Sequence, residues 1–472
     1  MQHYRNRYAN VYAEGVGFPS AVLQTISAAA TKQGSESYVE NASVGVFLQE
    51  QLSWKDRLFL TGAIRVDNNS AFGSDFDFVT YPKASLSWVV SEEPFWGGSL
   101  VNQLKLRAAY GASGQQPQTF AAIRTYNPTS RGDGSSTVTP GAVGNPLLGP
   151  ERGAELELGF EAGLLNDRLS LDFTYYNRQT KDAILSRPVA PSGGFTTDQF
   201  VNVGRIDNWG LELLATARLI QKRSLTFDLT ANASTNKNEI VDLGGPEIIS
   251  LDDVYQHRVG YPVYGMFHRR IVQAEHGANG IATNVLCDGG PGAAPVPCAT
   301  APRVYFGSAA SKWEGSLTST VTLFGRLTAF ATLETRRGAR LMDGDRIGRC
   351  SVRIACLENH RPLETDPITA AYLQSSGIPW GLYNSDATFT RLREISLTWG
   401  LPASTARWFG ASRALVSASA RNVALWQRLW SGDPEVTYGA AYSGSSAQVP
   451  STTNKDRIPM PVQFVGSIRV TF

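Results

Sequence analysis

The sequence predicts an all-β fold, an antiparallel β-barrel that crosses a membrane. Three observations lead to this prediction: apolar and polar residues alternate along many segments, short turns alternate with long polar connections, and charged residues are scarce. Only 18% of the 472 residues are charged, against roughly 25% in an ordinary soluble protein. The 42% hydrophobic content argues against a disordered chain, and the lack of a run of about 18 apolar residues excludes a helical membrane protein.

The alternation is clearest in a predicted hairpin at residues 154–162 and 168–175. In the first segment Leu156, Leu158 and Phe160 fall on one face, and glutamates fall on the other. Residues 165–167 form a short turn, and the same pattern resumes after it. A period of two residues is the periodicity of a strand with one apolar face.

About thirteen such strands can be placed in the sequence. They lie near residues 42–54, 58–66, 81–91, 103–111, 154–162, 168–175, 211–219, 225–233, 317–323, 327–333, 387–400, 412–424 and 461–472. Long connections rich in Gly, Pro, Ser, Asn and Asp separate the hairpins, at residues 112–150, 179–203, 235–311, 336–386 and 425–460. Short turns on one side and long loops on the other are typical of bacterial outer-membrane barrels.

The polar face of these strands carries many charges, which we interpret as the wall of a water-filled lumen. The candidates are Lys105, Arg107, Glu155, Glu157, Glu161 and Asp172. So many charges could not fill a dry core, because unpaired buried charge is very costly. A single half-solvated antiparallel sheet could alternate in the same way. The glutamates could also serve a glycosidase as paired carboxylates, but a lumen wall is the simpler interpretation.

The last strand ends on an aromatic residue and has an apolar face made of Phe464, Ile468, Val470 and Phe472. A final amphipathic strand of this kind resembles the assembly signal of outer-membrane barrels. In such barrels both termini face the periplasm, so an odd number of strands cannot close. We therefore expect residues 259–273 to lie in a loop or to pair with a strand near 302–310, because a lone extra strand would break this parity.

The N-terminal region, residues 1–40, reads as an extracellular loop or an incomplete strand region. It contains no apolar leader segment, although an outer-membrane protein requires one. Unless these residues contain a further strand, we expect the chain to be an incomplete part of a longer protein.

The sequence predicts neither catalysis nor a bound cofactor or metal. The five His residues show no close-spaced ligand pair, and no nucleophile-elbow or phosphate-loop motif occurs. Residues 433–435, Asp-Pro-Glu, could form a loop contact or a metal site, but a turn is the simpler interpretation. The net charge of +2 argues against a nucleic-acid-binding protein.

Two kinds of residue stand out in the long connections. The four Cys residues predict two local disulfides in an oxidising compartment, with pairing across the two loops as the alternative; they are Cys287, Cys298, Cys350 and Cys356. Loop aromatics could stack on sugar rings or could pack the loops together; the candidates for ligand contact are Tyr126, Trp380, Tyr383, Trp426, Trp430 and Tyr438.

Six stretches, in the same order along the chain, resemble segments of the SusC/RagA-type TonB-linked outer-membrane transporters. They are 62–73 (GAIRVDNNSAFG), 104–116 (LKLRAAYGASGQQ), 163–185 (GLLNDRLSLDFTYYNRQTKDAIL), 202–213 (NVGRIDNWGLEL), 389–402 (FTRLREISLTWGLP) and 420–435 (ARNVALWQRLWSGDPE). The similarity runs from about residue 40 to the end of the chain. Each motif is weak alone, and the ordered series carries the resemblance.

The resemblance implies a 22-stranded barrel with an N-terminal plug in the bacterial outer membrane. Residues 41–472 would then be the C-terminal part of the barrel, about 13–15 strands, without the plug. The expected partners are outer-membrane lipids, a SusD-like surface lipoprotein, the barrel-assembly machinery and, through a missing N-terminal region, the TonB–ExbB–ExbD complex. The expected function is active uptake of oligosaccharides or peptides. A passive porin or surface-binding barrel is the alternative, and a soluble β-rich binding protein is a third.

Overall fold

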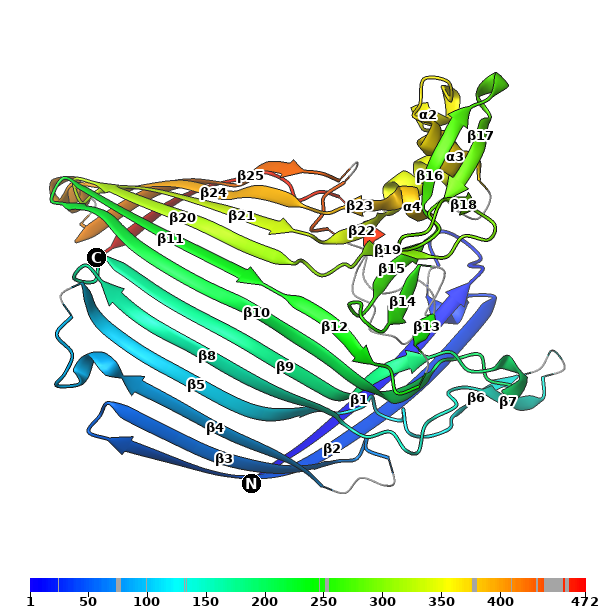
Figure 1. Cartoon of the computed structure of the whole chain (residues 1–472), viewed down its shortest axis with the longest axis horizontal. Helices are drawn as coiled ribbons and strands as arrows, with labels where there is room; N and C mark the ends of the chain where they lie inside the picture. Colours follow the sequence, from blue (N-terminus) through cyan, green and yellow to red (C-terminus); the bar gives the residue numbers. More distant parts are fainter. Residues whose placement is uncertain are drawn as a thin grey trace.

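A computed structural model shows one large curved sheet with a smaller loop subdomain at one end (Figure 1). It describes residues 1–23, 25–73, 78–98, 100–130, 132, 134–245, 247–250, 254–375, 380–408, 410–429, 432–436, 453–454 and 458–472. No helix in this described part is long and apolar enough to span a membrane.

The large sheet contains 15 strands, of which β12 (Lys237–Asp242) pairs only with β10 and lies off the main path. The other strands follow one another antiparallel in chain order. They are β1 (Gln2–Val16), β2 (Thr31–Trp54), β3 (Leu58–Asn69), β4 (Val79–Val89), β5 (Val101–Gln115), β8 (Glu151–Leu164), β9 (Leu169–Arg187), β10 (Gln199–Lys222), β11 (Leu225–Thr235), β20 (Trp313–Leu323), β21 (Leu327–Arg337), β24 (Phe389–Gly400), β25 (Arg413–Gln427) and β27 (Gln463–Thr471).

The connections at the two ends of these strands differ in length, as the sequence predicts. At one end the turns are tight: Lys55 and Asp56 both adopt φ near 53°, and Gly325 adopts 63°. Positive φ gives such turns a twist that matches that of the flanking strands. At the other end the connections are long and carry most of the remaining elements, to the right in Figure 1.

The strand register places apolar and polar residues in separate rows on opposite faces of the sheet. One apolar row runs through Ala329, Leu397, Ala418 and Gly466 on successive strands. Large side chains on this face are exposed, among them Leu397. The neighbouring row is polar, and in it Thr322 and Thr328 hydrogen-bond across two strands at 3.2 Å. The sheet therefore presents a continuous apolar surface on one side and a hydrophilic surface on the other.

The N-terminal segment, for which we expected an extracellular loop or an incomplete strand region, contains a strand. Residues Gln2–Val16 form β1, which pairs with the first part of β2. Residues 1–40 therefore contain the further strand that the parity argument allowed. The alternation is weak here because polar residues occur on both faces, so the pattern does not identify the strand.

One further difference concerns strand length, whereas the expectation for the loop strands is confirmed. The connection predicted at 179–203 is shorter, because β9 continues to Arg187 and β10 begins at Gln199. The segment at 259–273 lies in a loop and also pairs with the predicted partner: β15 (Gly265–His268) pairs with β19 (Val304–Gly307). This strand pair is separate from the large sheet.

We call the elements formed by the two longest connections the loop subdomain. Its strands are β13 (Ile248–Ser250), β14 (Tyr255–Arg258), β15, β16 (Ile271–His276), β17 (Ala282–Cys287), β18 (Val296–Pro297), β19, β22 (Arg340–Asp343), β23 (Asn384–Asp386) and β26 (Thr453–Asn454), which comes from a later loop. Its helices are α1 (Gly344–Arg346), α2 (Leu357–His360), α3 (Pro367–Gln374) and α4 (Trp380–Tyr383). Elsewhere, β6 (Tyr126–Ser130) pairs with β7 (Ser136–Pro140), and α5 (Ala403–Trp408) lies between β24 and β25.

The two connections that build the loop subdomain share one core. Met266 from the first packs with Met342 and Tyr383 from the second. A second contact joins them where the backbone N–H of Ile271 donates to the Tyr372 hydroxyl at 2.8 Å. Neither connection could bury these side chains alone, so the two loops stabilise each other.

His257 is buried in this subdomain with only 1% of its surface exposed. Neither ring nitrogen has a hydrogen-bond partner among the described residues, and the ring packs edge-on against Tyr264 at 4.8 Å. Burial lowers the pKa of His257 to about 4. The imidazole is therefore neutral in the folded subdomain at neutral pH.

This pKa predicts a subdomain that loses stability in acid. Between the ordinary pKa of 6.5 and about 4, the unfolded chain binds a proton that the folded chain does not, so stability falls as the pH falls through this window. The full loss is about 3 kcal/mol. Denaturant titration of the subdomain at pH 7 and pH 4.5 measures it. His257→Phe should flatten the pH dependence, whereas His360→Phe, at an exposed site, should leave it unchanged; equal slopes for both variants would refute the assignment.

Candidate functional site

Four of the six predicted lumen residues form one ion-pair network on the polar face of β5, β8 and β9. Arg107 Nη1 lies 2.9 Å from Glu161 Oε1, and Lys105 Nζ lies 3.1 Å from the same oxygen. Arg107 also pairs with Asp172 and donates to the Thr174 hydroxyl. Glu161 and Asp172 stand directly opposite each other, where like charges repel; Arg107 bridges them and removes that repulsion.

The other two predicted lumen residues, Glu155 and Glu157, lie farther along β8. They form no ion pair with any described residue. Glu157 is exposed and Glu155 is half-buried. The structure therefore does not bring all six charges together, and these two carboxylates are open to water or to a solute on the polar face.

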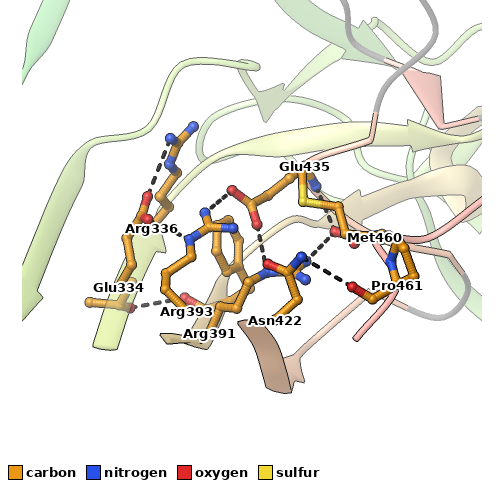
Figure 2. A network of polar contacts seen from close by, with 11 residues as sticks. Glu334, Arg336, Arg391, Arg393, Asn422, Glu435, Met460 and Pro461 are labelled. Atoms are coloured by element: carbon orange, nitrogen blue, oxygen red, sulfur yellow. Dashed lines mark hydrogen bonds and ion pairs between the residues drawn. The ribbon is translucent and has the colours of Figure 1, made fainter. Parts of the chain in front are cut away.

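A second charged network lies where β24 begins, at the loop end of the sheet (Figure 2). Arg391 is 2% exposed and pairs with Asp433 at 2.6 Å and with Glu435 at 2.7 Å. Arg393 pairs with Glu435 and, at 2.6 Å, with Glu334 on β21. We call these five residues the mouth cluster. It joins two strands to the loop that follows β25.

Asp433 also organises the loop to which it belongs. One carboxylate oxygen accepts the Glu435 N–H at 3.1 Å, and the other accepts the Met460 N–H at 3.2 Å. At the end of the same loop, Asn422 on β25 donates to the Pro461 carbonyl at 3.2 Å (Figure 2). The beginning and the end of the connection between β25 and β27 are thus held to the mouth cluster.

Sequence reasoning found the Asp-Pro-Glu segment of this cluster but treated it as a turn, and it missed the arginines. The signal available in the sequence was the pair of arginines at alternate positions in the 389–402 stretch, together with the acidic Asp-Pro-Glu segment of a later loop. It is weak because the partners are 42 residues apart in sequence. No group of three or more His, Cys, Asp or Glu that could hold a metal occurs in the part of the chain that the structure describes.

A family model described as TonB dependent receptor-like, beta-barrel matches residues 2–265. The chain belongs to this family. The match covers the strands from β1 to the first part of the loop subdomain, including the ion-pair network on β5, β8 and β9. The expected resemblance is thereby confirmed.

Individual relatives of this TonB-dependent receptor chain agree. TonB-dependent receptor P3 of Formosa agariphila is 24% identical over 477 residues, which cover 91% of this chain and 46% of the relative. TonB-dependent receptor SusC of Bacteroides thetaiotaomicron is 27% identical over 298 residues, 58% of this chain and 29% of SusC. A solved structure of the RagAB peptide transporter has a TM-score of 0.80 at 20% identity and covers all of this chain, 100%, and 52% of that chain. The chain spans about half the length of P3 and of the solved structure.

The family places the chain in the bacterial outer membrane, with an antiparallel transmembrane β-barrel fold. The exposed apolar face of the sheet then contacts lipid, and the polar face with its ion pairs borders water. Three of the four apolar residues predicted as an assembly signal, Phe464, Ile468 and Val470, lie on the apolar face of β27, and Phe472 follows the end of the strand. On β27, Phe464 and Ile468 stand opposite Ala420 and Val416.

The loop aromatics occupy different environments. Tyr126 and Trp426 are both exposed. Trp426 stands opposite Thr390, which stands opposite Thr335 on the apolar face of the sheet, so its exposed surface faces away from the polar side, and Tyr126 is the better candidate for ligand contact. Tyr383 is fully buried in the loop subdomain, and Trp380 packs against the same core, which is the packing role considered as the alternative. Trp430 and Tyr438 lie outside the described residues.

The four cysteines form two local pairs within the loop subdomain. Cys287 is bonded to Cys298, and Cys350 to Cys356, each with a Cα–Cα distance of 4.9 Å. Cys287 lies at the end of β17, and Cys350 and Cys356 flank a short loop before α2. Each bond closes a loop that has little regular structure of its own.

Removing Arg391 should strongly destabilise the mouth cluster. Arg391→Met leaves Asp433 and Glu435 buried with one cation fewer, which costs about 3–5 kcal/mol for a buried pair. The free energy of unfolding in lipid vesicles and the protease sensitivity of the loop after β25 measure this effect. Arg428→Met is the matched control, because Arg428 pairs with Asp386 at 3.3 Å while 73% exposed, and it should cost about 0–1 kcal/mol. Equal losses in the two variants would contradict a structural role for the cluster.

Lipid contact by the apolar face is tested by two adjacent residues on β24. Leu397→Arg places a charge on the apolar face and should destabilise the protein, by up to the roughly 2–4 kcal/mol that arginine costs at the bilayer midplane. Thr398→Arg places the same charge on the polar face and should cost little. Unfolding in lipid vesicles, with heat-modifiability on gels as a second assay, measures both variants. A larger cost for Thr398→Arg would show that the faces are assigned the wrong way round.

Proposed function

We propose that this chain is part of a TonB-dependent receptor that actively takes up large nutrients, oligosaccharides or peptides, across the outer membrane. The observation that carries the proposal is the division of the sheet: one face is apolar and exposed, and the other carries the ion pairs of Arg107 and its neighbours. Such a sheet supplies the lumen wall of a transporter, and the loop subdomain with the mouth cluster supplies its outer vestibule. Transport of this kind needs binding and passage and no bond chemistry.

The similarity to SusC and to the RagAB peptide transporter supports the partners that we propose. They are a SusD-like surface lipoprotein over the loops, the TonB–ExbB–ExbD complex as the energy source, outer-membrane lipids around the apolar face, and the barrel-assembly machinery acting on β27. We also propose that residues 41–472 form the C-terminal part of the barrel and that β1 adds to the same wall. Nothing in the described site indicates a catalytic arrangement.

A passive porin or a surface-binding barrel remains the second candidate, and its energy requirement separates it from the first. Uptake of labelled oligosaccharides and peptides should be compared in the source bacterium, in a deletion of this gene and in a tonB deletion. The proposal expects both deletions to abolish uptake of the same cargo. Uptake that survives the loss of TonB or of the proton gradient would identify a passive pore. Cargo that binds to the surface without entering would identify a binding barrel.

A further inference from the structure

A small pocket lies beside the mouth cluster, between the loop subdomain and the beginning of β24. Its volume is about 170 Å³. Phe389, Ala387 and Ala339 supply apolar walls, and Arg336, Arg340 and Ser311 supply polar ones. Pockets for whole ligands usually measure about 300–1,000 Å³, so this one fits a single end group of a larger molecule.

The Arg336 guanidinium has unused hydrogen-bonding capacity at this pocket. Its buried Nε–H has no hydrogen-bond acceptor among the described residues. The Glu314 carboxylate lies 3.9 Å from that nitrogen, beyond hydrogen-bond distance, and Nη2 reaches Glu334 at 3.4 Å. A buried charged donor without an acceptor is costly, and such groups mark places where a ligand supplies the missing partner.

Arg340 is the second cation of the pocket, and it forms no ion pair with any described residue. Among the described residues its Nη1 donates to the Asn384 carbonyl, at 3.3 Å, and its charge acts on Asp386 without a direct ion pair. The cross-strand neighbour of Arg340 is Asp386, but that carboxylate already accepts the Thr388 N–H at 2.9 Å and pairs with Arg428. Arg340 therefore has donors left for an acceptor from outside the chain.

The acidic residue of the pocket does not oppose an anion. Glu435 lines the pocket, but Arg391 and Arg393 from the mouth cluster both pair with it. Its charge is therefore neutralised within the mouth cluster. The two partly unpaired guanidinium groups, Arg336 and Arg340, are then the groups that a solute entering the pocket would meet.

We propose that this pocket binds a carboxylate end group of the cargo, a proposal that rests on the proposed uptake function. Arginine presents a planar fork of donors that matches the two oxygens of a carboxylate. The apolar side chains of the pocket lie beside the pair and reduce its contact with water, which strengthens it. The carboxylate could belong to a uronic acid of an oligosaccharide or to the C-terminus of a peptide; the chemistry recognised by the pocket is the same.

Isothermal titration calorimetry on the purified full-length protein tests this inference. One arm compares trigalacturonate with neutral trigalactose, and the other compares a pentapeptide that has a free C-terminus with its C-terminal amide. Hydrogen bonds between charged groups contribute about 1.5–3 kcal/mol, so the carboxylate form should bind roughly 10–100-fold tighter in one arm. The arm that shows the difference identifies the source of the carboxylate. Equal affinities in both arms, or tighter binding of inorganic sulfate, would overturn the proposal.

Two variants locate the binding in the pocket. Arg340→Gln should remove the preference for the carboxylate form, and Arg340→Lys should restore part of it. Ala339→Leu fills the pocket without changing its charge and should weaken binding in the same arm. Arg361→Gln, which removes an exposed arginine of the loop subdomain, is the matched control and should bind like the native protein. If Arg340→Gln and Ala339→Leu both bind normally, the pocket is not the site, whereas the uptake assay still decides the proposed function independently.

Discussion

The constraint on which the structure depends is that backbone polar groups within a bilayer have no water to bind. Every N–H and C=O must be paired inside the protein, and in this chain neighbouring strands supply those partners. The consequence is the unbroken antiparallel order from β1 to β27, in which each strand pairs with the next one along the large sheet. Tight turns at one end are compatible with this order because they keep neighbouring strands in register.

The same pairing forces a choice of side chain at every position. Successive residues point to opposite faces, so each strand in this sheet presents one set of side chains to lipid and the alternate set to water. The charges of the polar face are tolerated because they are hydrated and paired: Arg107 joins Glu161 and Asp172 across three strands. On the other face, Leu397 and its row remain exposed because lipid, rather than a protein core, is their solvent.

At the loop end the backbone polar groups can bind water, so strand pairing is no longer required, and other interactions order the chain. The long connections reach water and could adopt many conformations, so ordering them has an entropic cost. Shared apolar cores, two disulfides and the mouth cluster offset it. The mouth cluster is distinctive because Arg391 and Asp433 are almost fully buried. A buried charge without an opposite charge beside it is strongly destabilising, so each member of a buried pair needs its partner in place. The adjacent pocket, where the Arg336 Nε–H lacks an acceptor and Arg340 forms no ion pair among the described residues, is the exception that suggests a ligand.

The sequence by itself determined the fold class, most strand positions and the sidedness of the sheet, because all three follow from an alternation of period two that is local along the chain. It also indicated the Lys105 and Arg107 network, since these charges recur on one predicted face. The tertiary structure alone decided the rest. The polar β1 strand shows no clear alternation, and its pairing with β2 identifies it. The contacts of Arg391 and Arg340 depend on loops that fold back from distant positions in the sequence. The packing of these loops over the end of the sheet determines which charges meet, and a local sequence pattern does not predict it.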